Sequence, residues 1–183
     1  TMAHQDICEE QQKSSNKKAK VEISSILTVN SSKDLNDFIN LSQNERCDIK
    51  TIIIQDTDVA DRQPQCWEFK PLEGLGTLLD LLINDQSIQS LSFFNTLADD
   101  QLSKACCAMG KMKKLERFEM KHDTGTNRDL DQKMATAIAD SIQDHPSIKE
   151  VIIPGFEGTE EIAELIEAAA EKNEKKPTIE LDW

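Results

Sequence analysis

The eight residues LERFEMKH, from Leu115 to His122, carry apolar side chains at their first, fourth and sixth positions and mostly charged ones elsewhere. Successive side chains of a β-strand point to opposite faces of its sheet. Phe118 and Met120 therefore share one face, and the three charged residues that alternate with them share the other. Charged groups in this rhythm need solvent, so the stretch predicts a strand with one buried and one exposed face.

The same apolar pattern recurs along the chain. Its copies begin, in chain order and with the first and last being weaker, at Ile23, Ile49, Ile88, Leu115, Ile148 and Lys176. These starting points are 26, 39, 27, 33 and 28 residues apart. A basic unit of about 27 residues with two insertions explains the intervals, which indicates a repeat protein.

Each interval also holds a stretch with the helical apolar period, closed by a polar break. The apolar stripes of these helices begin at Leu35, Leu75, Leu102, Leu130 and Ile162. Ser31 or Ser32 is placed to cap the first helix. A doubly wound sheet would bury both faces, so the exposed face of the 115–122 strand favours helices on one side only. The prediction is an α/β solenoid of about five or six strand–helix units with a parallel sheet.

Strands of the form LxxLxL, each followed by a helix, resemble the leucine-rich repeats of the ribonuclease-inhibitor type. The unevenly spaced, leucine-poor repeats are similar in particular to the leucine-rich repeat domain of tropomodulins. The resemblance covers about residues 23–183 and implies a right-handed solenoid. Asp123 and Phe156 stand where the family has an asparagine after the last strand leucine. Domains of this kind serve in adaptors, actin-cytoskeleton regulators and effectors injected by intracellular bacteria, and the resemblance implies one of these roles.

Composition narrows the classes of partner and the compartment. The chain has 183 residues with 34 acidic and 21 basic side chains, for a net charge of −13, which disfavours nucleic acid and anionic membrane. No apolar run approaches the about 20 residues needed to cross a bilayer. Five cysteines without CxxC spacing predict free thiols in the reducing cytoplasm.

The polar residues 1–20 are predicted to be a disordered tail, and residues 21–183 a single domain. Within the tail, Lys17, Lys18 and Lys20 fit the loose pattern of a nuclear-import signal, although lysine runs of this length are common in solubilising tails.

The stretch VIIPGFEGTEEIAELI, residues 151–166, has the strand–turn–helix order of a phosphate-binding loop. It lacks the lysine of a P-loop and the GxGxxG of a dinucleotide loop. Thr159 is placed as an N-cap, and Glu160 and Glu161 occupy the first helical turn, where they would repel a phosphate. Its glycines, Gly155 and Gly158, are therefore predicted to turn the chain and not to bind a nucleotide.

No catalytic or metal-binding constellation is predicted. His122, Asp123 and Cys66 could be drawn together as a nucleophile set, but nothing in the sequence fixes their geometry. No His/Cys cluster has metal-ligand spacing, and no cofactor is predicted. The rival hypothesis of a small α/β enzyme requires a deep pocket at the carboxyl ends of the strands, lined by groups with perturbed pKa values.

The strand face that points away from the helices is the candidate site. The third, fifth and seventh residue of each repeat should lie on this concave surface. Ile53, Phe94 and Ile152 are predicted to be exposed apolar anchors there, with a charged strip of Arg117, Glu119 and Lys121 between them. A mixed patch of this kind is typical of protein-binding surfaces.

An insertion after the second strand carries Trp67, Phe69, Pro64 and Pro71. Its aromatic residues either cap one side of the solenoid or form a protruding contact loop, with Trp67 as a further partner-binding residue. The sequence thus predicts a monomeric, non-catalytic module that binds another protein. The alternative is a structural or self-associating repeat fragment.

Overall fold

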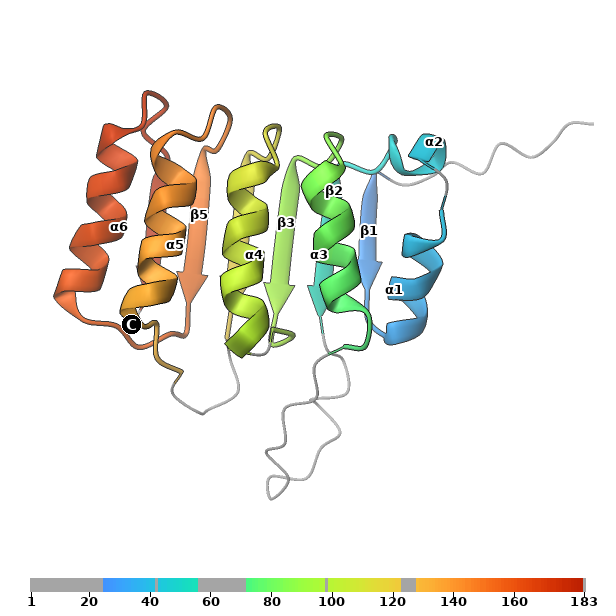
Figure 1. The fold of residues 1–183 in the computed structure, drawn as a ribbon, viewed down its shortest axis with the longest axis horizontal. Coiled ribbons are helices and arrows are strands. Elements are labelled where there is room, and N and C mark those ends of the chain that lie inside the picture. Colours follow the sequence, from blue (N-terminus) through green and yellow to red (C-terminus); the bar gives the residue numbers. More distant parts are fainter. Residues whose placement is uncertain (1–24, 42, 56–71, 98, 123–127, 183) are drawn as a thin grey trace, which may run out of the picture.

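Six parallel strands lie side by side in the order of the chain, in one open sheet (Figure 1). The computed structural model describes residues 25–41, 43–55, 72–97, 99–122 and 128–182. The strands are β1 (Ile26–Val29), β2 (Thr51–Gln55), β3 (Ser90–Phe94), β4 (Arg117–Lys121), β5 (Glu150–Pro154) and β6 (Thr178–Asp182). The predicted strands beginning at positions 49, 88, 115 and 148 are thereby confirmed.

The helices that connect the strands form a layer on one face of the sheet (Figure 1). They are α1 (Ser32–Ile39), α2 (Gln43–Arg46), α3 (Leu75–Asn84), α4 (Asp99–Lys111), α5 (Gln132–Gln143) and α6 (Glu160–Lys172). Each crossover passes over the same face and advances the chain by one strand, so the units wind as a right-handed solenoid. The predicted α/β solenoid with helices on one side is confirmed.

Consecutive units are joined in the same register. The N–H of Lys50 donates to the carbonyl of Ser25 at 2.8 Å, and the N–H of Lys149 donates to the carbonyl of Glu116 at 2.7 Å. From β1 to β5, the residue before each strand thus accepts from the residue that precedes the next one; before β6 stands Pro177, and the N–H of Thr178 donates to Lys149 instead, at 2.8 Å. This repeated contact aligns the first residues of adjacent strands with one another across the sheet.

The core lies between the sheet and the helices and is built from the predicted apolar positions. These positions in β2–β5 and just before them are at most 3% exposed: Ile49, Ile52, Ile54, Ile88, Leu91, Phe93, Leu115, Phe118, Met120, Ile148, Val151 and Ile153. In β6 the corresponding Ile179 and Leu181 are only partly buried. They belong to the last unit that the structure describes.

The register predicted for the first strand is wrong by one residue. Leu27 pairs with Ile52 and Val29 with Ile54, so these two side chains face the core. Ile26 instead pairs with Thr51 and is 52% exposed. Because Ile26 and Leu27 are both apolar, the pattern allows either register, and a shift of one residue exchanges the two faces.

Side-chain caps start α1 and α5, whereas Thr159 stands at the predicted N-cap position of α6 without a side-chain cap hydrogen bond. Ser31 caps α1, its hydroxyl accepting from the N–H of Asp34 at 3.2 Å. The fourth predicted helix begins at Gln132 and not at Leu130, because the carboxylate of Asp131 accepts from the N–H of Met134 at 2.7 Å and caps it there. The short α2, which has no apolar stripe, was not predicted.

The turn after β5 requires glycine. Gly155 has φ +78°, and a Cβ placed on it would lie 1.7 Å from the carbonyl oxygen of His122. The backbone of β4 therefore passes directly against this residue, and the N–H of His122 donates to Pro154 at 3.1 Å. The prediction that this glycine turns the chain is confirmed.

Candidate protein-binding face of the sheet

The helix-free face is the sheet surface opposite the helices. The strand register arranges its side chains in three rows across the sheet. The first row contains Ile26, Thr51, Ser90, Arg117, Glu150 and Thr178. The second contains Thr28, Ile53, Ser92, Glu119, Ile152 and Glu180, and the third contains Gln55, Phe94, Lys121 and Pro154. The predicted membership of this face is confirmed from β2 to β5 and for Thr178 and Glu180 of β6, and Ile26 and Thr28 are additions.

The predicted apolar anchors differ in exposure. Ile53 and Phe94 are half-buried, as side chains on an open sheet face should be. Ile152 is only 6% exposed, so its prediction as an exposed anchor is wrong. Its register neighbours in the second row are Glu119 and Glu180. Ile152 therefore belongs to the helix-free face by its position in the sheet, but its side chain is buried.

Arg117 and Glu119 of the predicted charged strip form an ion pair with each other, and each also binds a side chain on a neighbouring strand. The guanidinium of Arg117 lies 3.3 Å from the carboxylate of Glu119 and forms a second ion pair with Glu150. The hydroxyl of Ser92 donates to the same Glu119 oxygen at 3.1 Å. Partial burial works to lower the pKa of Arg117, but its hydrogen bonds to the two carboxylates outweigh burial and raise it. Arg117 is 38% exposed, so a partner would meet it already paired.

The helix-free face has two halves of different chemistry. The half formed by β1–β3 carries hydroxyl, amide and apolar side chains and no charge among its row members. There the amide of Gln55 donates to Asn30 at 2.7 Å. The half formed by β4–β6 carries the charged row members. An apolar diagonal of Ile26, Ile53 and Phe94 crosses the uncharged half, one residue on each strand.

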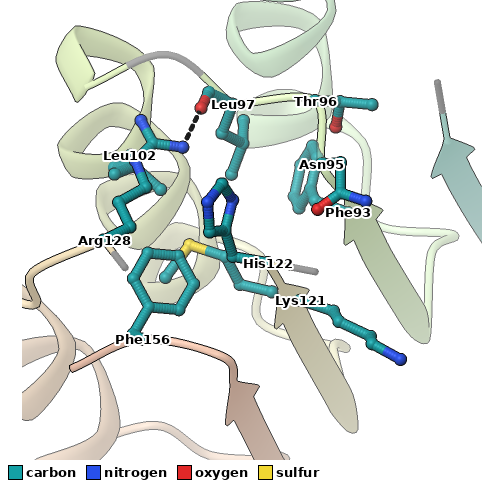
Figure 2. A pocket seen from close by; sticks show the side chains of 10 residues that line it. Phe93, Asn95, Thr96, Leu97, Leu102, Lys121, His122, Arg128 and Phe156 are labelled. Atoms are coloured by element: carbon teal, nitrogen blue, oxygen red, sulfur yellow. Dashed lines mark hydrogen bonds between the residues drawn. The ribbon is translucent and has the colours of Figure 1, made fainter. Parts of the chain in front are cut away.

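A small cavity lies at the carboxyl ends of the central strands, where the enzyme hypothesis requires a pocket (Figure 2). Its volume is about 10 Å³, which is the space of one water molecule. The guanidinium of Arg128 closes one side by donating to the carbonyl of Leu97 at 2.5 Å. His122 also lines it and packs against Phe156, with ring centroids 5.7 Å apart. The buried Thr96 also lines the cavity, together with Asn95 and Lys121.

The residues that could have formed a nucleophile set are only partly described. His122 is buried, whereas Asp123 and Cys66 lie outside the described residues. Across the described ranges, no group of three or more His, Cys, Asp and Glu side chains is placed to hold a metal ion. Cys106 is buried, and burial raises the pKa of its thiol to about 12. A thiol with this pKa is protonated at neutral pH and unreactive.

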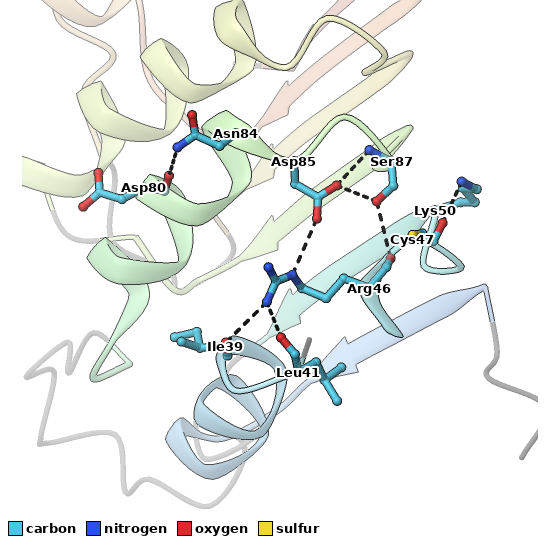
Figure 3. A network of polar contacts seen from close by, with 9 residues as sticks. All are labelled: Ile39, Leu41, Arg46, Cys47, Lys50, Asp80, Asn84, Asp85 and Ser87. Atoms are coloured by element: carbon cyan, nitrogen blue, oxygen red, sulfur yellow. Dashed lines mark hydrogen bonds and ion pairs between the residues drawn. The ribbon is translucent and has the colours of Figure 1, made fainter. Parts of the chain in front are cut away.

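A polar network at the amino ends of the strands holds α2 in place (Figure 3). The Arg46 guanidinium donates to the carbonyl of Leu41 and, at 3.5 Å, to that of Ile39. It also lies 3.8 Å from the carboxylate of Asp85. Asp85 in turn accepts from the N–H and hydroxyl of Ser87 at 2.8 and 2.6 Å. The side chain of Arg46 therefore joins the carboxyl ends of α1 and α3, in the first and second units.

Two buried side chains perform a similar task in the later units. The Nε2 of His145 lies 3.1 and 3.2 Å from the carbonyls of Met109 and Met112 at the end of α4. The amide of Asn173 donates to the carbonyls of Ile142 and His145, at the end of α5. Each side chain thus contacts backbone carbonyls at the carboxyl end of the helix one unit earlier. These carbonyls have no partner within their own helix. Only one signal in the sequence could have found them, namely a His or Asn within the polar break before a strand.

Several predicted residues lie outside the described part. These are the tail with Lys17, Lys18 and Lys20, and the insertion with Trp67. Their roles stay predictions. In the ranges that the structure describes, no helix is both long enough and apolar enough to span a membrane.

Comparison with solved structures supports the fold. A tropomodulin C-terminal domain from Caenorhabditis elegans matches with a TM-score of 0.54 at 16% sequence identity, over 81% of this chain and 83% of that one. At this identity the likeness concerns the fold alone, and it confirms a leucine-rich-repeat-like solenoid. The ribonuclease-inhibitor type stays a prediction. No protein-family model and no curated protein matches the chain.

Proposed function

We propose that this chain is a non-catalytic protein–protein interaction module that binds a partner protein on its helix-free face. The observation that carries the proposal is the one-sided helix layer. No described helix covers the opposite sheet face, whose rows combine the apolar Ile26, Ile53 and Phe94 with a pre-arranged charged cluster (Figure 1). Apolar anchors beside fixed charged groups are the composition of interface cores.

The tropomodulin domain of similar fold supports the choice of a binding scaffold over an enzyme. The pocket geometry points the same way, because the cavity at the carboxyl edge holds about one water molecule. The free thiols of Cys47, Cys106 and Cys107 support a reducing compartment such as the cytoplasm.

Site-directed cross-linking tests the proposal. A photoreactive amino acid replaces Phe94 in one variant and Ile53 in a second, and in a third it replaces Glu164, which is exposed on α6. We expect both sheet-face variants to capture the same proteins from cell lysate, and the α6 variant not to capture them. Phe94→Ala combined with Arg117→Glu should abolish capture from position 53. An unchanged set of captured proteins in this double variant would show that the helix-free face is not the binding surface.

Self-association is the second candidate, because both edges of the described sheet are open. Ile26 on β1 is 52% exposed, and Ile179 and Leu181 on β6 are only partly buried. We propose that the module is nevertheless a monomer, since Glu180 places a charge on the β6 edge strand, and charged side chains on edge strands oppose pairing. Light scattering at two protein concentrations decides between the two states.

A further inference from the structure

The charged half of the helix-free face has an excess of carboxylates. Glu119, Glu150 and Glu180 lie on three adjacent strands, and Arg117 is paired with the first two. Glu180 is exposed and forms no salt bridge to any residue in the described ranges. Lys121 is the other cation of this half, but it stands in the third row, whereas Glu150 stands in the first. Among the described row members of this half, three carboxylates stand against two cations, so negative charge is in excess there and Glu180 is the carboxylate without an ion pair.

The residue that lies between two of these carboxylates in the register is apolar. Ile152 pairs with Glu119 on one side and with Glu180 on the other. It is 6% exposed, so its side chain fills the space between the two acidic neighbours at the level of the sheet. A basic side chain fits above this position, because its charged head can stay among the carboxylates that flank it.

We propose that the partner presents an extended segment that crosses the strands, with an apolar side chain over Ile53 and Phe94 and an arginine or lysine between Glu150 and Glu180. The inference rests on the proposed function and specifies the chemistry of the partner. The chemistry of the segment follows from charge complementarity. Its apolar end would lie on the uncharged half of the face, and its basic end on the half with excess carboxylates. Arginine suits the site better than lysine, because its planar guanidinium can contact two carboxylates at once.

The two subsites are separated by a distance that a short peptide can span. The apolar subsite lies between β2 and β3 and the acidic subsite between β5 and β6, which is three strand spacings or about 14 Å. An extended chain covers this distance in about four residues at about 3.4 Å each. A pentapeptide with its apolar and basic residues at the two ends therefore reaches both subsites.

The experiment is a titration followed by NMR of the isoleucine methyl groups. The probe is the acetylated and amidated peptide Leu-Ser-Thr-Ser-Arg, and its matched control carries citrulline, the uncharged isostere of arginine, in place of the arginine. The signals of Ile53 and Ile152 are assigned with the variants Ile53→Val and Ile152→Val. We expect the arginine peptide to shift both signals in a saturable manner, and the citrulline peptide to bind at least about threefold more weakly.

Two variants locate the basic subsite. Glu180→Gln should weaken the arginine peptide by about two- to fivefold and leave the citrulline peptide unchanged, because the change removes an exposed charge without altering shape. Glu164→Gln on α6 makes the same change of charge away from the face, and we expect it to have no effect on either peptide. Both positions are exposed, so both variants should fold as the parent protein does.

Three results would overturn the inference. They are an absence of saturable shifts at Ile53 and Ile152, equal affinity for the arginine and citrulline peptides, and an equal loss of affinity in Glu180→Gln and Glu164→Gln. None of these results would contradict the proposed function, which the cross-linking from positions 53 and 94 tests separately. If cross-linking succeeds and the arginine peptide fails, the face binds a partner of other chemistry.

Discussion

The buried corner at His145 makes stability depend on pH in a way that the structure specifies. The Nδ1 of His145 accepts from the N–H groups of Ser147 and Ile148 at 3.2 and 2.9 Å, so this nitrogen carries no proton. The Nε2 faces two carbonyls and therefore bears the hydrogen. The folded state requires the neutral ring, because a proton on Nδ1 would point at two donors.

The direction of the pKa shift agrees with this geometry. Burial is the main cause that lowers the pKa of His145, and nearby Lys113 adds to it, while hydrogen bonds to Met109 and Met112 oppose it. The unfolded chain takes up the proton at about pH 6.5, before the folded protein does. Stability is therefore fully present above that pH and falls as the pH decreases toward the lowered pKa of the folded state, with a slope of at most about 1.4 kcal/mol per pH unit.

The assay is urea unfolding at several pH values between about 5 and 7.5 for the parent chain and for His145→Gln. Glutamine can donate to the carbonyls and accept from the N–H groups but does not titrate in this range. We expect the parent to lose free energy of unfolding relative to His145→Gln as the pH falls. His145→Ala should lose about 3 kcal/mol at pH 7.5, since about four hydrogen bonds disappear. Parallel pH curves for the parent and His145→Gln would refute the reasoning.

Three further predictions concern other sites. Gly155→Ala should lower the free energy of unfolding by at least about 3 kcal/mol in a urea titration, because the new Cβ meets a backbone carbonyl and φ is positive; a loss below about 1 kcal/mol would contradict the close approach. Arg46→Met should cost about 2 kcal/mol and speed hydrogen exchange in α1, since it frees the end of that helix. In a chain with Cys8 and Cys66 replaced by serine, Cys107 should react with a maleimide at pH 8 while Cys106 reacts only after unfolding.

The architecture could be predicted because its signals are local and repeated. The buried positions of β4, such as Phe118 and Met120, alternate with charged residues, and this fixes both the strand and its exposed face. The error in the first strand has the same origin. Where Ile26 and Leu27 are both apolar, the alternation that sets the register is lost, and only pairing with β2 decides it.

The features that escaped prediction depend on contacts between units. Ile152 is buried and has Glu119 and Glu180 as its register neighbours, a placement that the sequence alone does not show. His145 and Asn173 act on carbonyls more than 25 residues away, so the polar breaks that contain them look like ordinary loops. The pairing of Arg117 with Glu150 likewise joins two strands. A single sequence shows which residues share a face, whereas exposure and pairing on that face require the register.

The pairing of Arg117 changes how specificity on the helix-free face should be understood. An unpaired arginine would attract an acidic partner, whereas the sequence predicts only that Arg117 shares a charged strip with Glu119 and Lys121. In the structure its charge is shared between Glu119 and Glu150, so an acidic partner would have to displace carboxylates that are already in place. Displacement gains little, because one ion pair replaces another of similar strength. Arg117 therefore acts by fixing the two glutamates, and the charge left to recognise a partner is negative.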